Sequence, residues 1–240
     1  DFIYMVDRKG NFVEKYPVKL RSPATCGVSV FDYDNNRDYR LFIACEDKKI
    51  YAYDKEGSLV NGWSFENTES EVSQPVNHFR MGDKDFLVLG DRFRTYILDR
   101  KGNTRISTET YFPHSFRNNY SLHLQEDGSG ASVVTTDTTG KVHFILFSGN
   151  TRTVELDRFT GSHFFDYKDL NGDRKMEYIF LDGNRLLVYN SDEKLLFSYT
   201  FKESPHTRPV FYQFSASDRK MGVVCGEENL IYLFNNDGKL

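Results

Sequence analysis

The sequence lacks the features that mark several large classes of protein. It has three cysteines, Cys26, Cys45 and Cys225, and none belongs to a Cys-x-x-Cys pair. An odd number without such pairs disfavours a disulfide framework and a zinc site, and we expect buried free thiols. The net charge is -4, no run of Lys and Arg exceeds three residues, and no apolar run is long enough for a membrane span. These absences argue against a nucleic-acid partner, a polybasic membrane patch and a membrane-spanning segment.

Catalytic motifs and amphipathic helices are missing as well. No HExxH, GxSxG, Walker or Rossmann pattern occurs, so we predict no catalytic or cofactor-binding residue and do not expect an enzyme. Apolar residues come in runs of three to five between polar turns, which is not helical spacing. The sequence is instead rich in aromatics, with 21 Phe, 15 Tyr and one Trp. Such a composition favours strands and supplies a sizeable core.

Two sets of apolar runs repeat with nearly the same period. Runs beginning at Leu41, Phe86, Ser132, Tyr178 and Val223 are separated by 45, 46, 46 and 45 residues. A second run follows each of these five runs, and one more copy lies at the N-terminal end. The second runs end at Asp7, Asp54, Asp99, Ser148, Asn190 and Asn235. Two independent landmarks with one period indicate a repeat architecture.

The turn after the second run has a chemical explanation. It reads DRKG at 7–10, DKEG at 54–57, DRKG at 99–102 and NNDG at 235–238. Asp or Asn begins the turn because its side chain accepts hydrogen bonds from the backbone that follows, and Gly ends it because that position needs positive φ. A further strand follows the turn, and another precedes each first run, so each period holds four short antiparallel strands.

The predicted fold is an all-β protein, a β-propeller of four-stranded antiparallel blades. Its middle strands are apolar on both faces: Tyr51 and Tyr53 point one way, and Ile50 and Ala52 the other. Stacked blades bury both faces of a strand, whereas a plain sandwich would expose alternate residues. We expect one propeller over 1–240 with five to six blades' worth of chain, starting and ending mid-blade as part of a longer protein. Its parts are a half blade at 1–20, blades at about 26–65, 73–113, 118–159 and 161–201, and a partial blade at 208–240.

The stretch VFDYDNNRDYRLFIACEDKKIYAYDKEGSLVNGWSF, residues 30–65, resembles an FG-GAP or VCBS-type repeat of bacterial surface propellers. The shared pattern is an aspartate-rich loop, an apolar strand, a Y-hydrophobic-Y-D-x-x-G turn and a G-W motif. The repeated Y-A-Y-D-x-x-G also resembles quinoprotein-type propellers, which are the second choice. The first resemblance implies calcium in the loops and a periplasmic, cell-surface or secreted bacterial location.

One loop has the pattern of a calcium site. In DLNGDRKME, residues 169–177, oxygen-bearing side chains alternate and an acid stands ninth, which suits a hard cation held by oxygen ligands. Arg174 stands where the family has Gly, and the alternative is a polar hairpin without metal. The predicted ligands are Asp169, Asn171, Asp173, the Lys175 carbonyl and Glu177.

The loop at 32–40 is a weaker copy. Asp32, Asp34 and Asn36 match the first three ligand positions, but Arg40 stands ninth, where a cation opposes a metal. Asp38 could substitute for it, and an empty loop is the favoured interpretation.

Two groups of side chains are further candidates. Histidines on expected first strands could form a metal or acid–base cluster in a central channel, or simply bond within strands. Exposed aromatics could stack on a sugar or a protein partner, or simply pack between blades. The histidines are His78, His123 and His163 on first strands, His143 on a third strand, and His114 and His206 in loops. The aromatics are Trp63, Tyr111, Phe112 and Phe116.

The sequence therefore predicts a non-catalytic scaffold or binding module at the bacterial cell envelope, with calcium as a stabilising ion and a protein or glycan as partner. Two alternatives remain open, the propeller domain of a glycan-active enzyme and an extracellular sensor domain.

Overall fold

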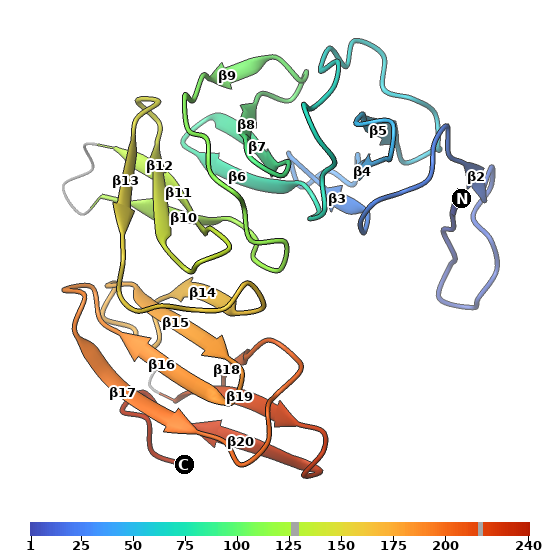
Figure 1. The fold of residues 1–240 in the computed structure, drawn as a ribbon. Coiled ribbons are helices and arrows are strands. Elements are labelled where there is room, and N and C mark those ends of the chain that lie inside the picture. Colours follow the sequence, from blue (N-terminus) through green and yellow to red (C-terminus); the bar gives the residue numbers. More distant parts are fainter. Residues whose placement is uncertain (126–129, 216–217) are drawn as a thin grey trace. The chain divides into compact units, whose positions relative to one another are not determined.

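The structure is a computed structural model that describes residues 1–125, 130–215 and 218–240. Regular structure in this part of the chain consists of twenty β-strands in six sheets (Figure 1). No helix among the described residues is long and apolar enough to cross a membrane. The chain forms two compact units, residues 1–133 with 145–152 and residues 134–144 with 153–240.

Each sheet is built from strands that follow one another in the sequence. The strand orders are β1-β2, β3-β4-β5, β6-β7-β8-β9, β10-β11-β12-β13, β14-β15-β16-β17 and β18-β19-β20. The strands are β1 Phe2–Ile3, β2 Val18–Lys19, β3 Ser29–Phe31, β4 Arg40–Ala44, β5 Ile50–Asp54, β6 Asn77–Met81, β7 Lys84–Gly90, β8 Thr95–Leu98, β9 Thr104–Ile106, β10 Ser121–Leu124, β11 Ala131–Thr136, β12 Val142–Leu146, β13 Thr151–Val154, β14 Phe164–Lys168, β15 Glu177–Asp182, β16 Arg185–Tyr189, β17 Leu195–Thr200, β18 Val210–Gln213, β19 Arg219–Cys225 and β20 Leu230–Phe234.

The middle strands are buried on both faces, as the sequence predicts. Along β15, Tyr178 and Phe180 enter one apolar cluster while Ile179 and Leu181 enter another. Because side chains alternate across a strand, every residue of such a run is apolar. The second cluster contains Val223 and other residues of the β18–β20 sheet, so two sheets of this unit pack face to face.

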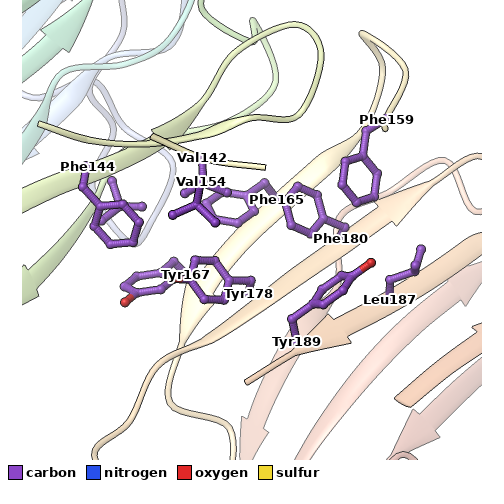
Figure 2. Packing of buried hydrophobic residues seen from close by; sticks show 11 residues of the cluster. Val142, Phe144, Val154, Phe159, Phe165, Tyr167, Tyr178, Phe180, Leu187 and Tyr189 are labelled. Atoms are coloured by element: carbon purple, nitrogen blue, oxygen red, sulfur yellow. The ribbon is translucent and has the colours of Figure 1, made fainter. Parts of the chain in front are cut away.

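Figure 2 shows the first of these clusters. Phe144 lies beside Tyr167 with ring centroids 5.6 Å apart, and Phe159, which precedes β14, stacks on Phe180 at 3.9 Å. The rings of Tyr167 and Tyr178 lie 5.1 Å apart. Aromatic pairs at these spacings contribute about 0.5–1.5 kcal/mol each beyond the burial of their surface.

The unit at 1–133 with 145–152 follows the same rule. On β7, Leu87 and Leu89 pack with the β3–β5 sheet, while Phe86 and Val88 face a second cluster that contains Tyr120. On β4 and β5, the alternation predicted for Tyr53 against Ile50 and Ala52 is confirmed, since these residues fall into different clusters.

The tight turns form as the sequence predicts. Asp99 Oδ1 accepts hydrogen bonds from the N–H groups of Lys101 and Asn103 at 2.8 and 2.9 Å, and Gly102 takes φ of 84°. Asp7 accepts the same two bonds, and Asp54 and Asn235 accept the bond from the residue four positions on.

The glycine of this turn also touches the segment before its own sheet. A Cβ on Gly102 would lie 2.8 Å from the backbone nitrogen of Phe65 and 3.0 Å from the Trp63 ring. A Cβ on Gly238 would lie 2.4 Å from Phe197 of β17. Glycine is therefore required at both positions for close approach as well as for positive φ.

The three cysteines are free thiols. Cys45 and Cys225 are buried, and Cys26 is partly buried. Burial raises the pKa of Cys45 to about 11, which keeps it protonated at neutral pH.

Replacing Gly102 by Ala should destabilise the protein more than replacing Gly10. Both glycines end a DRKG turn with nearly the same φ, but a Cβ on Gly10 meets nothing within 4 Å. Gly10→Ala therefore costs only left-handed strain, about 1 kcal/mol, and Gly102→Ala a further 1–2 kcal/mol, roughly, for the clash. Urea unfolding of both variants measures the difference, and equal losses would contradict packing at this turn.

Candidate functional site

The candidate site lies on the β7–β8 hairpin and on the linker that follows β9. The hairpin tip is Arg92–Phe93–Arg94, and the linker residues Tyr111–His114 run alongside it. Phe112 N–H donates to the Phe93 carbonyl at 3.1 Å, and His114 N–H donates to the Arg92 carbonyl at 2.9 Å. The two segments are thus joined by main-chain bonds, like short strands.

Asp91 holds the hairpin tip in place. One of its carboxylate oxygens accepts from the N–H groups of Phe93 and Arg94 at 2.9 and 2.8 Å. The other accepts from the Ser70 N–H at 2.9 Å and from the Tyr96 hydroxyl at 3.0 Å. Burial alone would raise the pKa of Asp91, but these hydrogen bonds outweigh it and the pKa is lowered. The carboxylate therefore stays ionised and fixes the tip.

Aromatic and arginine side chains gather on this hairpin and linker. Tyr111 is 61% exposed and its ring stacks on Phe93, with centroids 5.0 Å apart and planes 11° apart. The Arg92 guanidinium lies 5.1 Å from the Phe93 ring, and the Arg94 guanidinium lies 5.7 Å from the Tyr111 ring. We call Arg92, Phe93, Arg94 and Tyr111 the aromatic–arginine patch.

The four aromatics singled out from the sequence separate into two pairs. Trp63 packs in the β3–β9 core and donates its indole N–H to the Ile50 carbonyl at 2.8 Å, and Phe112 is 7% exposed. Interblade packing is thus the correct interpretation for these two. Tyr111 and Phe116, at 61% and 52%, are exposed.

The loop at 169–177 bends through left-handed backbone at Gly172 and Arg174. Arg174, which stands where the resembling family has Gly, takes φ of 71°, so the arginine adopts the left-handed bend at this position. Asp169 accepts from the N–H groups of Gly172 and Arg174 at 2.6 and 3.1 Å, and Asp173 accepts from that of Lys175 at 2.7 Å.

The side chains of this loop are bonded within the protein. Asn171 Oδ1 accepts from the Asp173 N–H, and buried Glu177 accepts from the Leu170 N–H at 2.8 Å. The Arg219 guanidinium lies 3.6 Å from the Asp169 carboxylate. Within residues 1–125, 130–215 and 218–240, no group of three His, Cys, Asp or Glu side chains is arranged to hold a metal ion. Calcium at this loop stays a prediction.

Three acidic side chains lie close together in this loop. Burial raises the pKa of Glu177, and the negative charges of Asp173 and Asp169 raise it further. The Arg219 guanidinium beside Asp169 supplies a positive charge that offsets part of this negative charge.

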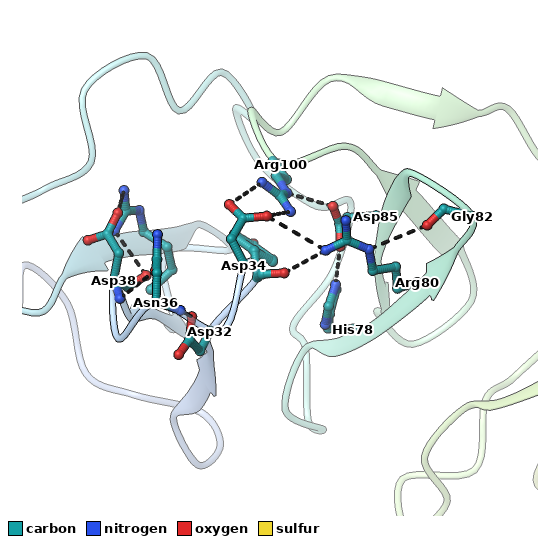
Figure 3. A network of polar contacts seen from close by, with 11 residues as sticks. Asp32, Asp34, Asn36, Asp38, His78, Arg80, Gly82, Asp85 and Arg100 are labelled. Atoms are coloured by element: carbon teal, nitrogen blue, oxygen red, sulfur yellow. Dashed lines mark hydrogen bonds and ion pairs between the residues drawn. The ribbon is translucent and has the colours of Figure 1, made fainter.

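The loop at 32–40 meets an arginine in the same way (Figure 3). Arg100 donates to both carboxylate oxygens of Asp34, at 2.9 and 2.8 Å, and to buried Asp85 at 2.6 Å. Asp85 also bonds His78 at 2.7 Å, and Arg80 lies 3.6 Å from Asp34. The network joins the β3–β4 loop to the β6–β9 sheet.

The charged side chains in this network are paired with one another. Burial would raise the pKa of Asp85, but bonds from His78 and Arg100 outweigh it, and the pKa is lowered. The Arg100 guanidinium likewise lowers the pKa of Asp34. Arg40, at the ninth position, pairs with Asp38 at 2.8 Å, so this loop neutralises itself. Carboxylates paired in this way are poorly suited to act as general acids at neutral pH.

The histidines are engaged in local bonds. His163 is fully buried and bonds Thr136 at 2.9 Å and the Thr160 carbonyl at 2.6 Å. His143 bonds Asp137 at 3.2 Å, and His114 bonds Thr95 at 2.9 Å. These contacts agree with the interpretation of the histidines as hydrogen-bonded residues of the sheets and linkers.

The residues that the sequence reasoning missed are Asp91, Phe93 and the arginines Arg100 and Arg219. The sequence could have pointed to Asp91, because an aspartate recurs after the apolar runs at Asp91, Asp137 and Asp182, at intervals of 46 and 45 residues. Asp182 also holds a linker, since it accepts from the Thr160 N–H at 2.9 Å.

Comparisons with known proteins establish the fold. No family model and no curated protein matches the chain. The crystal structure of BBS1N in complex with ARL6DN, soaked with lead, matches 97% of this chain and 72% of that chain, with a TM-score of 0.62 and 13% identity. The mercury-soaked structure of the same complex matches 89% and 80%, with a TM-score of 0.50 and 14% identity. The β-propeller prediction is confirmed, while FG-GAP or VCBS membership stays a resemblance.

Replacing Arg100 by Gln should cost about 3 kcal/mol of unfolding free energy, because it leaves buried Asp85 with His78 alone. Arg40→Gln is the control, since its partner Asp38 is exposed and the expected loss is at most about 1 kcal/mol. The folded pKa of Asp85 is lowered, so its stabilisation is complete above about pH 5 and is lost as the pH falls through the folded value. Denaturant unfolding between pH 3 and pH 7 should therefore show the unfolding free energies of wild type and Arg100→Gln converging as the pH falls. A pH-independent gap would contradict this account.

The calcium prediction for 169–177 requires that millimolar calcium raise the melting temperature and that EDTA reverse the rise. Asp173→Asn should abolish the response, because it removes a charged ligand. Asp192→Asn, which alters an exposed acid of the next turn, should keep it. Calorimetry of the three proteins decides, and equal melting with calcium and EDTA rejects the ion.

Proposed function

We propose that this chain is a non-catalytic β-propeller that binds a protein partner through the aromatic–arginine patch. The observation that carries the proposal is the stacked pair of exposed Tyr111 and half-buried Phe93, with Arg92 over the Phe93 ring and Arg94 over the Tyr111 ring. Tyr and Arg are enriched at the energetic centres of protein interfaces, where they offer large contact areas at small entropic cost.

The patch is rigid before any partner arrives. Asp91 bonds the tip of the hairpin, and main-chain bonds tie the tip to the linker. Preorganised side chains lose little freedom on binding, so more of the contact energy appears as affinity. Arg94 is already paired with Glu69 at 2.6 Å, so Arg92 is the cation that a partner carboxylate would meet beside the rings. A partner surface that offers apolar groups and a carboxylate complements this arrangement.

Two further observations support binding over catalysis. Asp34 and Asp85 are paired with Arg100, and His163 is hydrogen-bonded to Thr136, so these candidate acid–base side chains are engaged within the protein. The structural neighbours are propellers, and the two crystal structures contain BBS1N in complex with ARL6DN. This fold therefore supports partner binding in at least those cases. A glycan partner and a cell-envelope location stay predictions from the resemblance.

Tyr111→Ala tests the proposal against Tyr4→Ala, an equally exposed tyrosine at 62%. Proteins captured from the native extract by wild type and lost with Tyr111→Ala would be purified and titrated by calorimetry. We expect an interface centre to lose about 2 kcal/mol, which is roughly thirtyfold in Kd. Tyr4→Ala should bind like wild type, and both variants should melt near the wild-type temperature.

Two results would contradict the assignment of the patch as the docking surface. A purified partner that binds Tyr111→Ala with wild-type affinity, or that needs Tyr4 instead, removes the patch as the docking surface. Turnover of a substrate that is lost with Arg100→Gln would favour the enzyme alternative.

A further inference from the structure

A second site candidate lies in the other unit, at the foot of the loop 169–177. A cavity of about 70 Å³ opens there between the end of β14, the β18–β19 hairpin and the turn after β20. Its apolar wall includes Leu170, Met221 and Phe234, and its polar wall includes Lys168, Arg219 and Lys220. The volume accommodates a group of a few heavy atoms.

The cavity is surrounded by more positive than negative charge. Lys168, Arg219 and Lys220 line it, and Asp169 is the acidic residue among its lining side chains. Lys220 lies 3.3 Å from Asp218, and the Lys168 ammonium lies 4.7 Å from the Phe211 ring. A ring face offers a cation a weak contact without neutralising it.

Arg219 has donors to spare. Its Nη1 donates to the Asp169 carbonyl at 3.2 Å and lies 3.6 Å from the Asp169 carboxylate. Its Nε is buried and has no hydrogen-bond partner among the residues that the structure describes. A buried N–H without an acceptor is destabilising, and charged donors form their strongest bonds with oxyanions.

The walls of the cavity are held independently of any ligand. With its amide oriented as the surrounding carbonyls require, Asn236 donates to the carbonyls of Leu170 and Arg219 at 3.1 and 3.2 Å. These bonds fix the turn after β20 against both other walls. The cations therefore face a preformed space.

We propose that this cavity binds a small oxyanion, a carboxylate or a phosphate, with Arg219 as the central donor and Lys168 and Lys220 as flanking charges. The oxyanion supplies further acceptors to the Arg219 guanidinium, which lines the cavity, and the apolar wall excludes water from one side of the contact. The site is independent of the aromatic–arginine patch, which lies on different strands.

The test titrates the protein with inorganic phosphate and with malonate, each against sodium chloride at the same ionic strength and pH. Amide NMR shifts of Lys168, Arg219 and Asn236 report on the cavity. We expect saturable shifts with at least one oxyanion, and the comparison of the two probes assigns the phosphate or carboxylate preference. Lys168→Gln combined with Lys220→Gln should weaken binding at least tenfold while leaving Arg219 on Asp169. Lys194→Gln, an exposed lysine outside the cavity, should not change it.

Arg219→Gln should abolish the shifts, and Arg219→Lys should restore part of the affinity because it keeps the charge. Shifts no larger than those caused by chloride overturn the proposal. Binding that survives the double lysine variant and Arg219→Gln overturns it too, because the oxyanion would then sit elsewhere.

Discussion

Two-sided burial of the middle strands is the constraint on which this structure depends. A strand such as β15 has no polar face, so it is stable only between two other layers. Each fully buried aromatic or aliphatic side chain contributes about 1.5–3 kcal/mol, and these contributions are divided between the two neighbours. Polar chemistry is consequently confined to the strand ends, hairpins and linkers, where both candidate sites lie.

The fold could be predicted from the sequence because its signals are local. The Asp-x-x-Gly turns and the apolar runs each lie within a short window, and their recurrence about every 45 residues marks the repeat; the structure confirms the strands and turns. The candidate sites depend on long-range contacts. Residue type could not separate exposed Tyr111 from buried Phe112, because exposure depends on which segment covers each ring. Arg219 and Asp169 are fifty residues apart in the sequence, and no local sequence pattern at either residue predicts that they pair.

Arginine takes a recurring part in these contacts. Both aspartate-rich loops resemble cation loops, and in both a guanidinium from the following sheet lies on one of the carboxylates. A guanidinium carries one charge and a fixed fork of donors, so it joins two sheets while it neutralises a loop. In the aromatic–arginine patch, Arg92 is exposed beside the Phe93 ring, whereas Arg94 is half-buried and paired with Glu69 at 2.6 Å. Position, not residue type, decides whether an arginine here holds the protein together or is free to meet something else.

Two glycine turns rest on segments that precede them in the chain. Gly102 lies against Trp63 and Phe65, and Gly238 lies against Phe197, whereas Gly140 lies against Phe159, which follows it. Because synthesis runs from the amino end, the surfaces that receive Gly102 and Gly238 leave the ribosome before the turns themselves. These two contacts can therefore form during synthesis, while the contact at Gly140 waits for the next sheet.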